Sequence, residues 1–404
     1  MASVVLHIKD SYYFEVPKAL WPVRYSSKAE FPEVWVRLDP DFQLWDAERL
    51  YSHYAQLRSD APPFAKLKGD YVSWKADHKH AGKPFDQFLV QHADAEWFGD
   101  YLARPDNAQV WQNAVRSARN VDEYKNVDPS RWSAEKIQAY NHHLSGKILI
   151  PQPFGGSLRN LYQRESGFCL SKFMVIELGV ALILCLLFGW LARRVGRGDR
   201  PQGRLWNLLE SFVVFIRDQV ARPAIGHHDA DRFVPLLLTL FFFILGCNLS
   251  GMLPWLGSPT ASFSTTLGLA VVTFATVLGS GFAKLGFFGF FANMAPKIDL
   301  PWVISLPISL FVLVIEVASL CIRHGVLAIR LLANMVAGHI VLISIMMLAF
   351  SVQGAMSSHW TLTAVIAVVG STLLSVLELF VAFLQAYIFT FLSALFIGSA
   401  IHHH

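Results

Sequence analysis

The chain has 404 residues, of which 53% are hydrophobic and only 16% are charged, and its formal net charge is +4. This composition excludes an ordinary water-soluble globular protein, and so small a positive charge gives no support for nucleic-acid binding. The cysteines are scattered, without the spacing of metal ligands, so neither a disulfide framework nor a zinc site is expected.

Charged residues are frequent up to Glu165 and sparse beyond it, which divides the chain into two regions. We expect residues 1–165 to form a polar N-terminal extension and residues 166–404 to form a membrane domain. The extension starts with an extended aromatic segment at 7–17, followed by apolar residues at helical spacing. The predicted helices are Asp46–Leu57, Pro84–Leu102, Asn107–Val121 and Ser133–Leu144. We interpret the extension as a small, mostly helical domain without catalytic residues.

The second region predicts an all-α membrane protein, because about five apolar segments can each cross a hydrocarbon core of roughly 30 Å. The last two are too long to stand perpendicular to a membrane, so we expect them to be tilted, broken or partly interfacial. One further segment is amphipathic and predicts an interfacial helix. The spans are Phe168–Leu191, Phe233–Leu253, Thr265–Phe288, Leu306 to about Phe350 and Thr361–Ile401, and the interfacial helix is Leu205–Val220.

Two local patterns refine this picture. The arginine-rich segment at 193–204 directly follows the first span, and the positive-inside rule places it in the cytoplasm. The N-terminal extension is then expected on the non-cytoplasmic side, although residues 1–30 contain no apolar segment typical of a secretory signal. In the third span, small residues predict close helix packing, namely Gly279, Gly281, Gly286 and Gly289.

Ionisable residues inside the fourth span point to a functional site. A charge near the bilayer centre costs at least about 2.5–3.5 kcal/mol, so such a residue is rarely incidental. At about 100° per residue, Glu316, Arg323 and Arg330 share one helix face with Asn334, whereas His339 lies opposite.

Arg330 needs an anionic partner, because a guanidinium does not deprotonate in proteins. Glu316 lies about 21 Å from it along the helix axis, too far for an ion pair. Glu378 in the last span is the nearest other acid, but the topology places it toward the outer surface. We therefore expect the partner of Arg330 on another chain.

The segment at 330–339, RLLANMVAGH, resembles the signature of subunit a of the rotary F-type ATP synthase. That signature is Arg, Leu, any residue, Ala or Gly, Asn, two variable residues, Ala, Gly, then His or Glu. Glu316 matches the family's acidic residue on the same helix. The last span resembles the family's final helix, in which a titratable residue, here Glu378, precedes a glutamine, here Gln385. The resemblance covers the chain from about residue 168 onward.

One position differs from the family's pattern. A proline usually follows the basic residue that precedes the signature, whereas Arg323 is followed by His324.

The resemblance implies a proton-translocating stator subunit that is not catalytic by itself. Its implied partners are a ring of small proteolipid (c-type) subunits, peripheral-stalk (b-type) subunits, the lipid bilayer and, indirectly, the soluble ATPase sector. The implied location is an energy-coupling membrane, either a bacterial plasma membrane or an organellar inner membrane. The implied proton-translocation residues are Arg330, Glu316, Asn334, His339, Glu378 and Gln385.

Each of these residues has an implied role. His339 and Glu378 belong to an outer half-channel that delivers protons to a ring carboxylate, and Arg330 favours proton release from that carboxylate. Glu316 lines the inner half-channel, and Asn334 and Gln385 hold Arg330 in place or hydrate its surroundings. Asn248 and Arg323 are expected to serve helix packing or to line a channel.

Two other classes of protein remain open from the residues alone. A secondary ion transporter would also carry buried charges, but the chain shows no internal repeat. A scaffold subunit of another membrane complex could use the same residues for assembly. The sequence contains no nucleotide-binding loop, so we do not expect it to hydrolyse ATP, and we expect neither a metal nor a cofactor.

Overall fold

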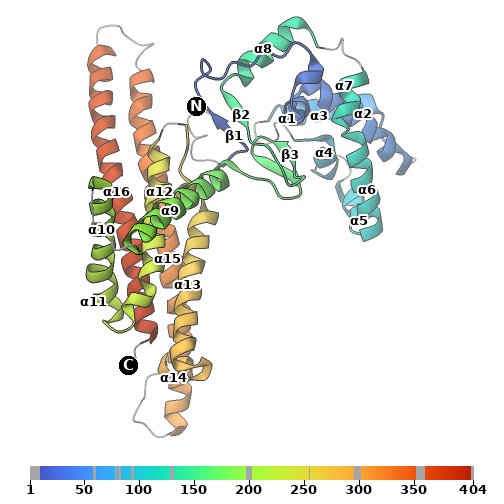
Figure 1. Ribbon diagram of the computed structural model, residues 1–404. Coiled ribbons are helices and arrows are strands. Elements are labelled where there is room, and N and C mark those ends of the chain that lie inside the picture. The colour runs from blue at the N-terminus through green and yellow to red at the C-terminus, as the bar shows by residue number, and fades with distance from the viewer. Residues whose placement is uncertain are drawn as a thin grey trace. The chain divides into compact units, whose positions relative to one another are not determined.

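The computed structural model describes residues 10–57, 61–77, 80, 83–91, 95–127, 132–196, 203–253, 255–294, 302–351 and 360–401 (Figure 1). The chain divides into two compact units. The N-terminal unit comprises residues 11–170, and the membrane unit comprises residues 171–404 together with residues 1–10.

The N-terminal unit consists of short helices and two small antiparallel sheets. In the first sheet Tyr13 lies opposite Leu149, and the second sheet is a hairpin with irregular register. The helices are α1 (Glu33–Leu38), α2 (Pro40–Leu57), α3 (Phe64–Lys75), α4 (Phe85–Gln91), α5 (Ala95–Leu102), α6 (Pro105–Ala118), α7 (Val121–Val127) and α8 (Ala134–Leu144). The strands are β1 (Tyr13–Glu15), β2 (Lys147–Leu149), β3 (Ser157–Asn160) and β4 (Gln163–Ser166).

Aromatic side chains fill the core of the N-terminal unit on two sides of α2. Tyr54 packs against Phe98 in one cluster, and Phe42 packs against Tyr124 in the other. Burying a side chain of this size contributes about 1.5–3 kcal/mol. The core therefore depends on rings from segments far apart in the sequence.

The structure confirms part of the helix prediction for this unit. Helix α2 contains the predicted Asp46–Leu57, and Ser133 caps α8 by accepting a hydrogen bond from the Lys136 amide at 3.2 Å. The predicted helix Asn107–Val121 is confirmed as α6 up to Ala118, but its end is wrong, because the Asn120 side chain accepts a hydrogen bond from the Glu123 amide and starts α7. Pro84–Leu102 is also wrong as one helix, because α4 and α5 are separate elements.

Among its described residues, the membrane unit contains five helices that are long and apolar enough to cross a membrane, which confirms the predicted fold class. Helices α12, α13 and α15 all pack against α16 (Figure 1). The five are α9 (Lys172–Gly196), α12 (Ala230–Met252), α13 (Phe263–Leu285), α15 (Trp302–Ser351) and α16 (Trp360–Ile401). The shorter elements are α10 (Arg204–Phe215), η4 (Ile216–Ala221), α11 (Arg222–Ile225), η5 (Pro259–Ala261) and α14 (Phe287–Met294).

Helices α15 and α16 are each continuous, over 50 and 42 residues. At 1.5 Å per residue they are about 75 Å and 63 Å long, more than twice the thickness of a hydrocarbon core. Of the three expected ways to fit such lengths, a broken helix is therefore excluded.

The glycines of the third span have different roles. A Cβ atom at Gly281 would collide with the Phe290 ring, which confirms the predicted close packing there. Gly286 has a φ of +73° and ends α13, a conformation that favours glycine. At Gly279, no described atom lies within 4 Å of an added Cβ, so the predicted packing role is wrong.

Candidate functional site

Helix α15 presents Arg330 at the border between its packed face and an exposed apolar strip. Leu327 and Leu331 are buried in the helix bundle, whereas Ile329 is 56% exposed. The Arg330 side chain is half-buried, and no carboxylate of the described residues lies within 4 Å of it. The guanidinium therefore lacks a counter-charge from the described part of its own chain.

About one helical turn beyond Arg330, a side-chain hydrogen bond joins α15 to α16. Asn334 Nδ2 donates to Gln385 Oε1 at 2.8 Å, and Gln385 is almost fully buried. Gln385 Nε2 has no hydrogen-bond partner among the described residues. Two of the predicted site residues are thus joined, and the Gln385 amide still has a hydrogen-bond donor to offer.

His339 and Glu378 form a second link between the same two helices. His339 Nδ1 lies 3.2 Å from Glu378 Oε1, and the side chains are only 16% and 9% exposed. This distance suits an ion pair, but Glu378 Oε1 has no aligned hydrogen bond within the described chain. A Cβ at Gly338 would lie 3.1 Å from that oxygen, so the missing side chain makes room for the carboxyl group. An imidazole beside a carboxyl group can pass a proton between them.

Glu316 is paired, which sequence reasoning missed. Arg323 Nη2 donates to Glu316 Oε1 at 3.2 Å, and the two side chains are 42% and 38% exposed. The seven-residue spacing brings both side chains to one face of α15, and that spacing was the signal available in the sequence. The pair is open to its surroundings, in contrast to the enclosed His339 and Glu378.

The polar groups lie at separate levels along α15. Arg323 is about 10 Å from Arg330 along the helix axis in one direction, and His339 is about 14 Å away in the other. Arg330 therefore lies between an exposed ion pair and a buried titratable pair.

Asn248 makes the contacts of a helix-packing residue. Its side chain is fully buried, donates to the Ala382 carbonyl at 3.2 Å and accepts from Thr260 Oγ1 at 2.7 Å. It thereby joins α12, η5 and α16.

Two further polar residues of the membrane unit were not assigned from the sequence. His324 is 3% exposed, its Nδ1 lies 2.8 Å from the Leu320 carbonyl, and its ring packs against Phe274 and Phe396. Glu177 on α9 accepts a hydrogen bond from Thr265 on α13 at 2.7 Å. An acid in the first span and a histidine in place of the usual proline were the available signals.

Comparisons with known proteins identify the family of the chain. The family model described as ATP synthase A chain matches residues 174–398. The chain is 37% identical to ATP synthase subunit a of Chloroherpeton thalassium over 276 residues, covering 67% of this chain and 78% of that protein. It is 37% identical to ATP synthase subunit a 2 of Chlorobium luteolum over 341 residues, covering 83% of this chain and 91% of that one. With ATP synthase subunit a of an Anaeromyxobacter species, the identity is 41% over 274 residues, covering 67% and 61%.

Proposed function

Because the chain belongs to the ATP synthase subunit a family and is thus a membrane subunit of an F-type ATP synthase, not catalytic by itself, we propose that it translocates protons. Two half-channels, each open to one side of the membrane, meet at a rotating ring of proteolipid (c-type) subunits. Peripheral-stalk (b-type) subunits connect the chain to the soluble ATPase sector. Family membership argues against a secondary transporter or a scaffold of another complex.

The observation that carries this proposal is the unpaired Arg330 between two separate polar pairs. A charged group at membrane depth needs a counter-charge, and none lies within 4 Å of Arg330 among the described residues. A carboxylate on the ring subunit supplies it. The exposed apolar strip beside Arg330, which includes Ile322, Ile329 and Ile340, faces the ring.

The proposed proton path begins at His339 and Glu378, which form the outer half-channel. They pass a proton to the ring carboxylate, which can then cross the lipid as a neutral group. After a rotation the carboxyl group meets Arg330, whose fixed positive charge favours ionisation and so releases the proton. Glu316, paired with Arg323, lines the inner half-channel. Arg330 also prevents a direct leak between the half-channels.

Asn334 and Gln385 support this path by position rather than by proton transfer. Their hydrogen bond joins α15 to α16 about one turn from Arg330. Holding the two helices in register keeps His339 opposite Glu378.

We also propose that residues 1–165 form a polar extension on the non-cytoplasmic side, and that residues 166–404 form the membrane domain in a bacterial plasma membrane. Arg193 and Arg194 in the last turn of α9 support this orientation. A cysteine introduced at the exposed Asp106 of the extension should react with a membrane-impermeant maleimide only from outside. Labelling only from the cytoplasmic side would contradict the orientation.

The decisive experiment replaces Arg330 by alanine in the assembled complex. We expect coupled ATP synthesis to vanish while passive proton conductance through the membrane sector persists or rises, because the barrier and the release partner are both lost. Both quantities are measured in vesicles with verified complex content. Normal synthesis by assembled Arg330→Ala complexes would disprove the proposal, as would failure to assemble, which indicates a structural role.

A further inference from the structure

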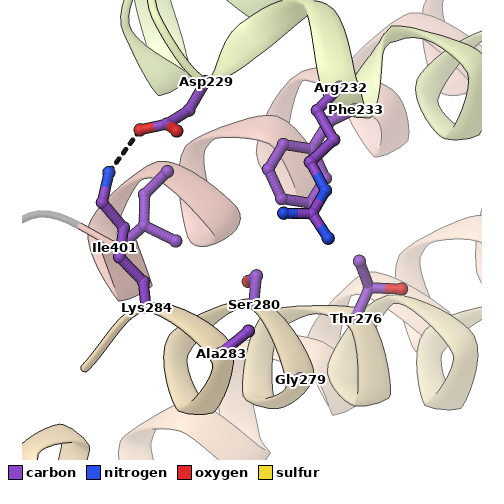
Figure 2. A pocket seen from close by; sticks show the side chains of 9 residues that line it. All are labelled: Asp229, Arg232, Phe233, Thr276, Gly279, Ser280, Ala283, Lys284 and Ile401. Atoms are coloured by element: carbon purple, nitrogen blue, oxygen red, sulfur yellow. Dashed lines mark hydrogen bonds and ion pairs between the residues drawn. The ribbon is translucent and has the colours of Figure 1, made fainter. Parts of the chain in front are cut away.

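A cavity of about 410 Å³ lies at the end of the membrane unit where α12 begins and α13 and α16 end. Helices α12 and α13 both pack against α16, and the cavity lies between the two (Figure 2). The residues that line it are Asp229, Arg232, Phe233, Thr276, Gly279, Ser280, Ala283, Lys284 and Ile401.

Two basic residues, Arg232 and Lys284, line the cavity. Lys284 forms an ion pair with Asp229 at one side. Figure 2 shows the Arg232 guanidinium extending from α12 toward Ser280 and Thr276 on α13. Among the residues that the structure describes, no carboxylate lies within 4 Å of Arg232. The charge of Arg232 is therefore available to an anion.

The groups facing Arg232 suit a phosphate. The hydroxyl groups of Ser280 and Thr276 donate to carbonyls of their own helix at 2.9 Å and 2.8 Å. These hydroxyls can rotate to donate to a phosphate oxygen instead, and a guanidinium binds phosphate through two parallel hydrogen bonds.

The surroundings favour a phosphate that belongs to a lipid. All three helices that line the cavity are membrane spans, and the cavity lies at their ends, the level of lipid headgroups. One turn deeper on α13, Val272 is 49% exposed and continues the wall as an apolar surface. Basic pockets between membrane helices bind anionic headgroups in this way.

We propose that this cavity binds the phosphate group of an anionic glycerophospholipid, with Arg232 as the charge partner and an acyl chain along the exposed side of α13. Gly279 provides the space, because no described atom lies within 4 Å of a Cβ built there. The site is independent of the proposed proton path.

The test measures lipid bound to the purified full-length chain by native mass spectrometry during titration with phosphatidylglycerol. Gly279→Leu fills the cavity, and Gly268→Leu is the matched control, because Gly268 lies on the same helix and also has free space. Arg232→Gln removes the cation, and Arg204→Gln removes an exposed arginine outside the cavity. We expect Gly279→Leu and Arg232→Gln to weaken binding by about tenfold or more, and both controls to leave it unchanged.

Three results would overturn the proposal. The first is equal retention of phosphatidylglycerol by Gly279→Leu or Arg232→Gln and the wild type. The second is equal binding of zwitterionic phosphatidylcholine, which would show no selection for anionic lipid. The third is displacement of the lipid by millimolar inorganic phosphate, which would indicate a site for the free anion. None of these readouts depends on ATP synthesis.

Discussion

Arg119 in the N-terminal unit is almost buried and Arg330 in the membrane unit is half-buried, and the two differ in their surroundings. The Arg119 side chain is 10% exposed and lies among three carboxylates of its own unit. It contacts Asp86 directly, Glu165 at 3.1 Å and Asp46 at 3.5 Å. Arg330 has no such carboxylate among the described residues.

The difference separates a structural arginine from a functional one. The carboxylates around Arg119 compensate for the loss of hydration within the fold, so the network belongs to the stability of the N-terminal unit. Nothing of this kind compensates Arg330, which requires a group from outside the described chain. Burial of an arginine alone therefore does not mark function, whereas a missing counter-charge does.

The largest effect on stability is expected from Arg119→Ala. Leaving the buried Asp46 and the partly buried Asp86 without their cation should lower the free energy of unfolding of the N-terminal unit by about 3–5 kcal/mol. This loss of stability is measured by chemical denaturation of the full-length protein, with hydrogen exchange in peptides of α2 and α6 as the readout. Arg116→Ala is the matched control, because Arg116 is exposed in the last turn of α6, which Arg119 caps, and it should change stability by less than about 0.5 kcal/mol. Equal losses of stability in Arg119→Ala and Arg116→Ala would show that the carboxylates around Arg119 do not give it a special structural role.

Arg330→Lys should leave folding intact and impair activity. A lysine ammonium has a different reach, lacks the planar fork and can deprotonate when buried. We expect ATP synthesis per assembled complex to fall by about 100-fold, equivalent to about 2.7 kcal/mol, with an unchanged melting temperature. Arg323→Lys is the control, because its exposed pair with Glu316 tolerates a point charge. A loss of stability without a loss of activity would place Arg330 in the same class as Arg119.

The stability of the N-terminal unit should depend on pH through Asp46. Burial raises the pKa of Asp46 to about 6 despite the nearby charge of Arg119. Because the folded-state pKa lies above the unfolded value, the contribution to stability is greatest below about pH 4 and is lost as the pH rises through 6. Relative to Asp46→Asn, the wild type should lose about 2 kcal/mol between pH 4 and pH 7, measured by denaturant unfolding. Parallel pH profiles of the two proteins would contradict this.

A smaller effect is expected from the coupling between His339 and Glu378. Replacing either by leucine should slow proton-driven ATP synthesis, and the double variant should be no worse than the poorer single one, because one path is already blocked. The coupling energy should be about 1 kcal/mol in a double-mutant cycle of synthesis rates. In the control cycle, Glu316 and Arg323, a half-exposed pair, are each replaced by glutamine. Their coupling energy should be less than half of that between His339 and Glu378. Fully additive effects at His339 and Glu378 would indicate two separate roles.

Much of the structure of the membrane unit could be predicted from the sequence, because its helices depend on local sequence patterns. Twenty or so apolar residues suffice for a span, and helical periodicity alone brings Glu316 and Arg323 to one face. Arg330 could be recognised for the same reason. The free-energy cost of placing a charged side chain inside a membrane is evident from the sequence alone. The helix breaks of the N-terminal unit were missed, because one side-chain cap at Asn120 outweighs periodicity.

Only the tertiary structure decided which residues meet. His339 contacts Glu378, and Asn334 bonds Gln385, because α15 and α16 pack in one register that Gly338 makes possible. The carboxylates around Arg119 come from α2, α4 and β4, segments that are far apart in the chain. Such contacts depend on how side chains interlock across elements, and periodicity carries no information about that register. The sequence by itself thus determined the spans and the unpaired arginine, while packing selected the partners of the other charges.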